Sequence, residues 1–456
     1  MKPNILLFVI DSLRSDKIFG KQKTVKIPTI DSMINNGIYF TNAFTTNHYT
    51  SQVMQSIFTN RFLFDDDITK NYSNKNNQDQ ITFLSLLKKN GYHTYTLNQE
   101  DVFFQGFNEK FDDKDISFKS EENLYNGLEE RILNKFDHMD ESWFFYVHLQ
   151  DLHTPCVVPS ELEHLTLVER YDQNLSRVDE LLKKILKIID IKNTLIILTA
   201  DHGEYVSSID GSLNESNSTK KTVKDSIKTV VPLKILEKLH VKKQKINRSI
   251  NARKTNIPHE KRMLSFKRQM PNQTLFDDIV HVPLLFYGHG MNHVVPITQQ
   301  ICNIDIFPTI FDQFKFTDSI KNGHGRSLVP LIKNREFSSI PLYMTSLAIL
   351  NQLKMNISLE NASDSLVGIR TEKFKYFRNF QDKDKDVHLY DIINDPLEDV
   401  NISNKRKEIV KEMELILEKF KNQSHTSDYK NNTDENDLDE DEIKRAQESL
   451  KKLGYI

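Results

Sequence analysis

Residues 195–204 read Leu-Ile-Ile-Leu-Thr-Ala-Asp-His-Gly-Glu, and this stretch decides the fold. Its four consecutive apolar residues, two of them β-branched, predict a strand that is buried on both faces, as strands of parallel sheets are. Asp201 and His202 follow the end of that strand, where open α/β sheets bind their ligands. A carboxylate and an imidazole there are ordinary metal ligands. On this stretch alone, a helix-capping role for Asp201 is an equally good interpretation.

Two other apolar stretches lead into polar side chains in the same way. Residues 4–10 run into Asp11, and residues 143–149 run into Asp151 and His153. If the three strands are neighbours, their polar ends meet at one edge of a sheet. Asp11 could instead cap the turn that follows it, and a single histidine is often structural. The alternation of buried strands with helical stretches predicts an α/β/α sandwich with a large, mostly parallel central sheet.

A fourth polar position precedes a predicted helix. Apolar residues recur at helical spacing from Val53 to Phe58, and Thr50 and Ser51 stand just before them. The pattern alone favours a capping role for these hydroxyls. The alternative is functional, because the free amides and the dipole at a helix N-terminus favour an anion or an attacking hydroxyl.

Composition shifts divide the chain into three parts. Residues 1–335 are expected to form the catalytic α/β domain, residues 336–421 a small α+β subdomain with an antiparallel sheet, and residues 422–456 an acidic linker with a terminal helix. Within the first part, residues 211–272 are rich in Lys and Arg. We expect a solvated insertion there, and the functional alternative is a basic lip that attracts an anionic polymer or a lipid surface.

The overall composition excludes several classes of protein. The 456 residues carry 61 basic and 64 acidic side chains, so the net charge indicates no nucleic-acid partner. Cys156 and Cys302 are the two cysteines, which favours a reducing compartment over a disulfide framework. No apolar run is long enough to span a bilayer, and residues 4–10 are too short for a signal peptide. We therefore expect a cytoplasmic protein, while its oligomeric state stays open.

Strings along nearly the whole chain resemble the sulfatase-like branch of the alkaline phosphatase superfamily. The resemblance begins with NILLFVIDSLRSD, whose Asp11 matches a metal ligand of that family. FTNAFTTNHYTSQVMQSIFTNR then aligns with the family's nucleophile helix. It continues in the family's order through WFFYVHLQDLHTP, LIILTADHGE, TLFDDIVHVPLLFYG, DIFPTIFD, GRSLVPLI, KFKYF, LYDIINDPLEDVN and LKKLGYI. This order and spacing are specific for the family and much less so for the substrate.

Several positions depart from the sulfatase pattern. Sulfatases proper carry Cys or Ser within C-x-P-S-R, which becomes formylglycine, whereas this chain has Thr50 at that position and Met54 in place of the Arg. The second Asp of many sulfatases is Ser12 here, the expected sulfate-binding Lys is Asn272, and the Arg before Val-Pro is His281. A threonine nucleophile resembles the relatives that attack phosphate esters, such as phosphoethanolamine and glycerophosphate transferases and nucleotide phosphodiesterases.

The resemblance implies that one divalent metal ion is held by four side chains, namely Asp11, Thr50, Asp201 and His202. We predict phosphoryl-type transfer through a covalent Thr50 ester, because metal coordination activates an otherwise weak hydroxyl nucleophile. His153 is expected to hold the ester oxygens or to protonate the leaving group. His281 is the second candidate for that role.

The ion and the substrate stay open at this point. Carboxylates favour Ca, Mg or Mn, and His202 also admits Zn. A second ion, held by Asp151, His153 and His281, would make a two-metal clamp with cations ~4 Å apart. The expected partner is an anionic small-molecule, glycan or lipid-linked ester substrate, attacked by a hydrolase or a phosphotransferase. Two alternatives are hydrolysis of a sulfate ester and a degenerate site that binds an anion or glycan without turnover.

Overall fold

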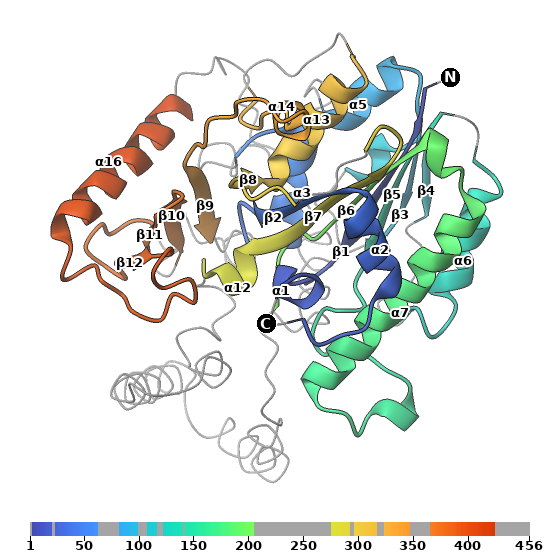
Figure 1. Ribbon diagram of the computed structural model, residues 1–456, viewed down its shortest axis with the longest axis horizontal. Coiled ribbons are helices and arrows are strands. Elements are labelled where there is room, and N and C mark those ends of the chain that lie inside the picture. The colour runs from blue at the N-terminus through green and yellow to red at the C-terminus, as the bar shows by residue number, and fades with distance from the viewer. Residues whose placement is uncertain are drawn as a thin grey trace, which may run out of the picture.

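Two β-sheets organise the protein in its computed structural model (Figure 1). The basic stretch 211–272 lies outside the residues that the structure describes. The predicted acidic linker 422–456 does so from residue 425 onward, and its residues 422–424 end the helix α16 (Lys407–Ser424). The described residues are 2–20, 23–62, 82–98, 107–115, 122–139, 142–204, 275–291, 296–316, 323–346 and 365–424.

The large sheet has eight strands in the order β4-β3-β5-β1-β6-β7-β2-β8. All its pairings are parallel except those of β7, which runs antiparallel to both β6 and β2. The prediction of a large, mostly parallel sheet is therefore confirmed. The strands are β1 (Asn4–Ile10), β2 (Ile38–Phe44), β3 (His93–Leu97), β4 (Asp113–Asp115), β5 (Trp143–Leu149), β6 (Thr194–Thr199), β7 (His281–Gly288) and β8 (Ile301–Cys302).

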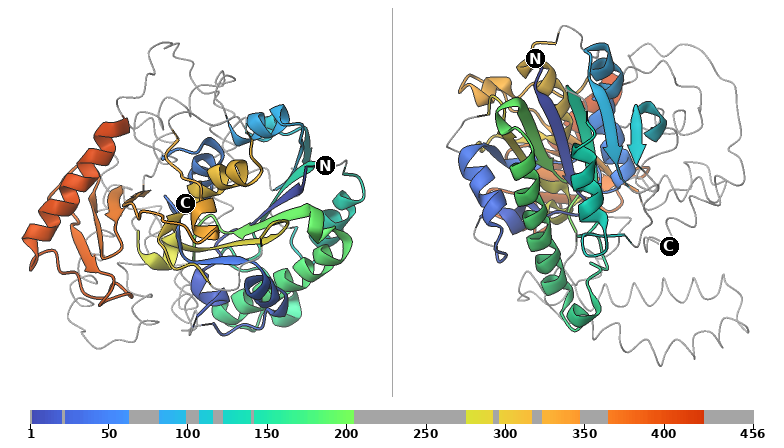
Figure 2. Two further views of the ribbon diagram at one scale, coloured as in Figure 1. Left: turned by 45° about the horizontal axis from the view of Figure 1, so that its top comes forward. Right: turned by 90° about the vertical axis from the view of Figure 1, so that its right-hand side faces the viewer.

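Helices cover both faces of this sheet and produce two hydrophobic clusters (Figure 2). In β1, Phe8 and Ile10 belong to one cluster, whereas Leu7 and Val9 belong to the other, as the two-residue period of a strand requires. The first face carries α1 (Ser15–Ile18), α2 (Pro28–Asn36), α6 (Leu128–Phe136) and α7 (Leu167–Ile188). The second face carries α3 (Thr50–Thr59), α5 (Phe83–Lys89), α13 (Ile306–Gln313) and α14 (Val329–Ile332).

Short 3₁₀ segments join some of these elements. The described ones are η2 (Asn108–Lys110), η3 (Ser160–Leu162), η4 (Ile191–Asn193) and η5 (Asn303–Asp305). Among the described helices, none combines the length and the apolar composition that crossing a bilayer would require.

The small sheet lies beside the large one and is antiparallel throughout, in the order β12-β11-β10-β9 (Figure 1). A third hydrophobic cluster joins it to the long C-terminal helix and to the short helix α12, which precedes β7. This confirms the predicted small antiparallel sheet with a helix. The elements are α12 (Asp277–Val280), β9 (Leu342–Ser346), β10 (Leu366–Arg370), β11 (Phe374–Asn379), β12 (His388–Asp391) and α16 (Lys407–Ser424).

Candidate active site

Three neighbouring strands bring the predicted polar positions to one edge of the large sheet. β1 lies between β5 and β6, with Ile10 opposite Leu149 and Val9 opposite Thr199. The backbone amide of Asp11 donates to the carbonyl of Leu149 at 2.8 Å, which fixes the start of the next turn. The carboxyl ends of these strands therefore meet, as their sequence pattern predicted.

The hydroxyl of Thr50 reaches this edge of the sheet from helix α3. It is the first residue of α3, where Tyr49 is the N-cap residue and no side chain caps the helix. The Thr50 hydroxyl instead donates to Asp201 Oδ2 at 2.5 Å, and it lies 3.3 Å from His202 Nε2. The capping role that the local pattern favoured for Thr50 is thus wrong, because Tyr49 occupies the N-cap position and the Thr50 hydroxyl donates to a carboxylate from a distant strand.

The other predicted ligands converge on the same point. His202 Nε2 lies 3.4 Å from Asp201 Oδ2 and 3.8 Å from Asp11 Oδ1. Ser12 links the two carboxylates, since its amide donates to Asp201 at 3.2 Å and its hydroxyl donates to Asp11 at 2.9 Å. The structure therefore gathers Asp11, Thr50, Asp201 and His202, and their role as metal ligands stays a prediction.

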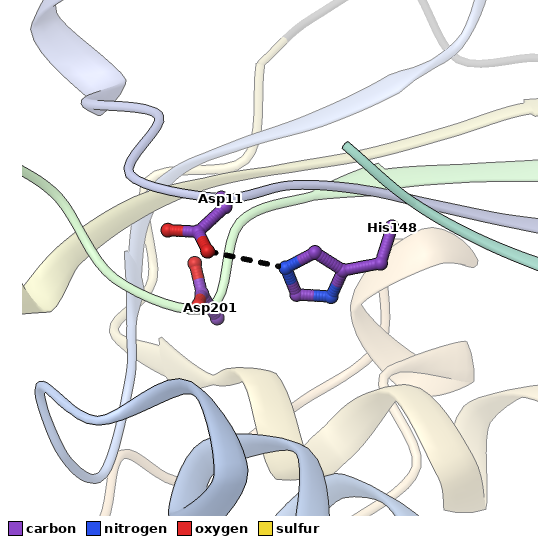
Figure 3. A group of neighbouring side chains, drawn as sticks. All are labelled: Asp11, His148 and Asp201. Carbon is purple, nitrogen blue, oxygen red and sulfur yellow. Dashed lines mark ion pairs between the residues drawn. The ribbon is translucent and has the colours of Figure 1, made fainter. Parts of the chain in front are cut away.

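Strand β5 adds a histidine that the sequence reasoning missed. His148 is fully buried, and its Nε2 lies 3.5 Å from Asp11 Oδ2 (Figure 3). Its other ring nitrogen, Nδ1, lies 2.5 Å from the hydroxyl of Tyr146. One ligand atom each from Asp11, His148 and Asp201 lies within 4.8 Å of the others, so the three could hold one metal ion. The available signal was a tyrosine and a histidine two residues apart, hence on one face, in an otherwise apolar strand.

The electrostatics of this group call for a cation. Asp11 and Asp201 are buried, and among the described residues the ion pairs of these two carboxylates are with imidazoles rather than with Lys or Arg. Burial alone would raise the pKa of Asp11. The nearby His153, His148 and His202 outweigh burial and hold that pKa well below its usual range. Burial alone would lower the pKa of His202. The carboxylates of Asp201 and Asp11 outweigh burial and raise that pKa above its ordinary value. Two buried carboxylates with neutral nitrogen and hydroxyl neighbours fit a divalent metal ion.

His153 lies beside this group, on the loop that follows β5. Its ring centroid is 6.5 Å from that of His202, and its Nδ1 is 2.9 Å from the carbonyl of Thr154. The amide of Thr154 in turn donates to Glu204 at 3.3 Å, which ties the β5 loop to the β6 loop. His153 is half-buried, and its catalytic role stays a prediction.

His281 and Asp151 have other partners. His281 Nε2 lies 2.7 Å from the carbonyl of Thr41, and the ring stacks on Phe44 at 4.9 Å. Asp151 accepts from the amide of Leu124 at 2.9 Å, and burial raises the pKa of Asp151 to about 6. Within the described ranges, the one group of three metal-ligating side chains is that of Asp11, so a second ion gains no support. The catalytic role predicted for His281 is not tested.

The match to known families follows this geometry. The family model described as sulfatase matches residues 3–316, which include β1, α3, β5 and β6. The chain belongs to the sulfatase family. A second family model, the C-terminal part of N-sulphoglucosamine sulphohydrolase, matches residues 267–423, which include the small sheet. Membership of the sulfatase family supports an ester-hydrolysing enzyme, and it agrees with the resemblance seen in the sequence.

Sulfatases also appear among the curated relatives. Arylsulfatase K of Gallus gallus is 27% identical over 157 residues, which cover 34% of this chain and 28% of that protein. An arylsulfatase of Clostridium perfringens is 30% identical over 111 residues, which cover 23% of this chain and 22% of that protein. The chain thus spans no more than about a third of the length of the curated relatives it matches.

Solved structures share the sulfatase fold over nearly the whole chain. A protein in complex with its substrate D-glucosamine-2-N,6-O-disulfate has 16% identity and a TM-score of 0.64, covering 94% of this chain and 99% of that chain. The phosphonate monoester hydrolase of Agrobacterium radiobacter has 14% identity and a TM-score of 0.63, covering 92% of this chain and 96% of that chain. At these identities the likeness establishes the fold alone.

Proposed function

We propose that this sulfatase-family protein is a metal-dependent enzyme that cleaves phosphate esters or diesters through a covalent ester on Thr50. One observation carries the proposal: Thr50 Oγ1 lies 2.5 Å from Asp201 Oδ2 at the N-terminus of α3. A hydroxyl that only capped the helix would accept from amides of the first turn. Here the hydroxyl donates to a buried carboxylate, which is the arrangement of a nucleophile with a proton acceptor beside it.

In the first step, Thr50 Oγ1 forms a bond to phosphorus and its proton passes to Asp201 Oδ2, the acceptor of its hydrogen bond. The bond from phosphorus to the leaving oxygen breaks, and protonated His153 delivers a proton to that oxygen. The positive end of the α3 dipole lies at Thr50 and would stabilise the charge of the non-bridging ester oxygens.

In the second step, water attacks the Thr50 phosphoester and passes one proton to His153. Thr50 Oγ1 leaves as the phosphate departs and recovers its proton from Asp201, so the side chains return to their starting state. An alcohol in place of water would make the protein a transferase, and the same side chains would serve.

Asp11, Thr50, Asp201 and His202 would hold the metal ion of this enzyme. When bound, a divalent ion such as Mn, Ca, Mg or Zn lowers the pKa of the threonine hydroxyl and neutralises the ester oxygens. The burial of Asp11 and Asp201 keeps water away from the ligands and strengthens their interaction with a cation.

The proposed substrate is an anionic glycan, small-molecule or lipid-linked ester. Two structural neighbours were solved with sugar ligands, D-glucosamine-2-N,6-O-disulfate and a neocarrahexaose. We extend this preference for anionic sugars to the present chain, with the basic stretch 211–272 as a contact surface for an anionic polymer or membrane. A cytoplasmic location remains part of the proposal.

A side-by-side assay tests the reaction. Aryl phosphate, aryl phosphodiester and aryl sulfate are offered to the chelated protein after addition of Mn, Ca, Mg or Zn. We expect turnover of a phosphorus ester, and an acid quench should yield a peptide phosphorylated on Thr50. Thr50→Ser is the matched control, because it keeps the hydroxyl, whereas Thr50→Ala removes it. Equal turnover by Thr50→Ala would contradict the proposal.

Hydrolysis of a sulfate ester is the second candidate, and the family match favours it. It predicts turnover of aryl sulfate alone and a sulfated Thr50 peptide after the quench. A degenerate binding protein is the third candidate. It predicts tight metal binding, retention of a sulfated or phosphorylated glycan, and no turnover of any of the three esters.

A further inference from the structure

Ser12 and His148 stand on either side of Asp11 at the proposed metal site. Ser12 lies in left-handed backbone at φ 64°, and its hydroxyl donates to Asp11 Oδ1 at 2.9 Å. His148 comes from the adjacent strand β5 and approaches the other carboxylate oxygen, Asp11 Oδ2 (Figure 3). The neighbours of Asp11 on these two sides are thus a hydroxyl and an imidazole, and neither of them adds negative charge as a further carboxylate would.

Among the described residues, one ring nitrogen of His148 has no partner that meets the criteria of a hydrogen bond. His148 Nε2 is buried, and its distance of 3.5 Å from Asp11 Oδ2 is too long for a good hydrogen bond. A fully buried nitrogen whose one contact is a long ion pair is poorly satisfied, so a closer partner at that position would be stabilising. That nitrogen is one of the three atoms that lie within 4.8 Å of one another beside Asp11 and Asp201.

Tyr146 holds the imidazole from its far side. The Tyr146 hydroxyl lies 2.5 Å from His148 Nδ1, and both residues are fully buried. If Nδ1 carries the ring proton and donates it to the tyrosine oxygen, the lone pair of Nε2 points at Asp11 and Asp201. Histidines that bind metal ions are commonly oriented by such a hydrogen bond from the other ring nitrogen.

We propose that His148, positioned by Tyr146, binds the metal ion through Nε2 and makes the site select Zn or Mn over Ca. The proposal rests on the metal site of the proposed function and extends it from four ligands to five. With Asp11, Thr50, Asp201, His202 and His148, the site offers two imidazoles, two carboxylates and one hydroxyl. Ca prefers six to eight oxygen ligands, whereas imidazole nitrogen suits Zn and Mn.

Metal-binding equilibria of the full chain test this. The protein is stripped with a chelator and titrated with Zn, Mn and Ca, and with Co as a probe whose visible absorption reports its ligands. His148→Gln should weaken Zn and Mn binding by about tenfold to a hundredfold or more and alter the Co spectrum. It should change Ca binding by less than about threefold, since Ca gains little from imidazole.

Two further variants keep the test decisive if His148→Gln fails to fold. Tyr146→Phe retains the ring and should weaken Zn binding by about tenfold. Its control is Tyr376→Phe, which removes a tyrosine hydroxyl bonded to Glu414 in the small sheet and should leave every titration unchanged. Ser12→Asp adds a carboxylate beside Asp11 and should raise Ca affinity by about tenfold.

The result that overturns the proposal is a Co spectrum and a Zn affinity that neither His148→Gln nor Tyr146→Phe alters. If Asp201→Asn still abolishes metal binding in that case, the proposed function survives and only the role of His148 is lost. Metal binding that Asp201→Asn leaves intact would instead remove the metal site itself, and the extension to His148 would fall with it.

Discussion

Two pairs of carboxylates in this molecule have different kinds of partner: Asp11 and Asp201 are both buried, whereas in the other pair Glu398 is buried and Asp277 is half-buried. Beside α12, Asp277 and Glu398 meet cations of the chain itself. Lys375 Nζ lies 2.6 Å from Asp277 Oδ1 and 2.9 Å from Glu398 Oε1. Arg370 also donates to Asp277, at 3.0 Å. We call this group the Asp277 cluster: Asp277, Arg370, Lys375 and Glu398.

The second pair, Asp11 and Asp201, lies at the ends of β1 and β6. Among the described residues, its partners in ion pairs are imidazoles, and Thr50 and Ser12 supply hydroxyl and amide donors. Burying two carboxylates without a fixed cation is costly, and a metal ion offsets that cost. The comparison teaches that the Asp277 cluster carries its own Lys and Arg cations, whereas the described ion pairs of Asp11 and Asp201 are with imidazoles.

The largest contrast should appear in turnover. Asp201→Asn removes the acceptor of the Thr50 proton and a proposed metal ligand, so we expect a loss of about a thousandfold or more in rate. Asp277→Asn should leave the rate per folded molecule within about threefold, because the Asp277 cluster makes no described contact with Thr50. Steady-state assays on the preferred ester compare the two variants. Equal losses in both would end the distinction between the two pairs.

Stability should show the reverse order. Asp277→Asn leaves Arg370 and Lys375 buried without their shared partner, and we expect the free energy of unfolding to fall by about 3–5 kcal/mol. Urea unfolding measures it. The control is Asp113→Asn, which breaks a half-exposed pair with Lys135 and should cost about 0–1 kcal/mol. A similar small loss in both variants would show that the buried cluster is not tightly held.

The Asp277 cluster should also respond to pH. Burial raises the pKa of Glu398 to about 7, although Lys375 opposes the shift. A folded pKa above the ordinary value of 4.5 means that this contribution to stability is complete below pH 4.5 and is lost as pH rises through about 7. We expect the unfolding free energy to fall by on the order of 1 kcal/mol per pH unit in that window. Glu398→Gln should flatten the curve, and an unchanged slope in this variant would refute the assignment.

The smallest expected effect is on the stability of the chelated protein, and it tests directly whether Asp11 and Asp201 repel each other when no metal ion is bound. In the chelated protein, Asp201→Asn relieves repulsion between two buried carboxylates, so the variant should be more stable than the parent by about 1 kcal/mol. With saturating metal the order should invert, because only the parent gains about 3 kcal/mol from an ion at a hundred times its Kd. Thermal unfolding with and without chelator measures both. A chelated variant less stable than the chelated parent would contradict the idea that this pair lacks a cation.

Much of this site could be predicted because its residues follow local patterns. Asp11 and Asp201 each come directly after a strand that is buried along its whole length. The rule that ligands bind at the carboxyl ends of strands then places them together. Thr50 needed the family resemblance, because its own surroundings favoured a capping role.

The missed residues depend on tertiary neighbours. His148 lies inside β5, where every residue is buried, and a histidine in such a strand is usually read as part of the core. Its candidate role depends on Tyr146, which lies on the same face of β5, and on Asp11, which follows the neighbouring strand β1. The Asp277 cluster joins α12, β10, β11 and the segment after β12, and no local pattern pairs segments so far apart in sequence.

The antiparallel course of β7 has a consequence for how this architecture can diversify. The chain leaves the sheet after β6 and returns to the same edge before β7, and the exit and return are joined where the amide of Gly203 donates to the carbonyl of Ile279 at 2.7 Å. A side chain at position 203 would lie 2.3 Å from the carbonyl of Asp278, so the junction requires glycine. A closed junction of this kind lets evolution, or an engineer, change the length and composition of the intervening sequence without reworking the strand pairing.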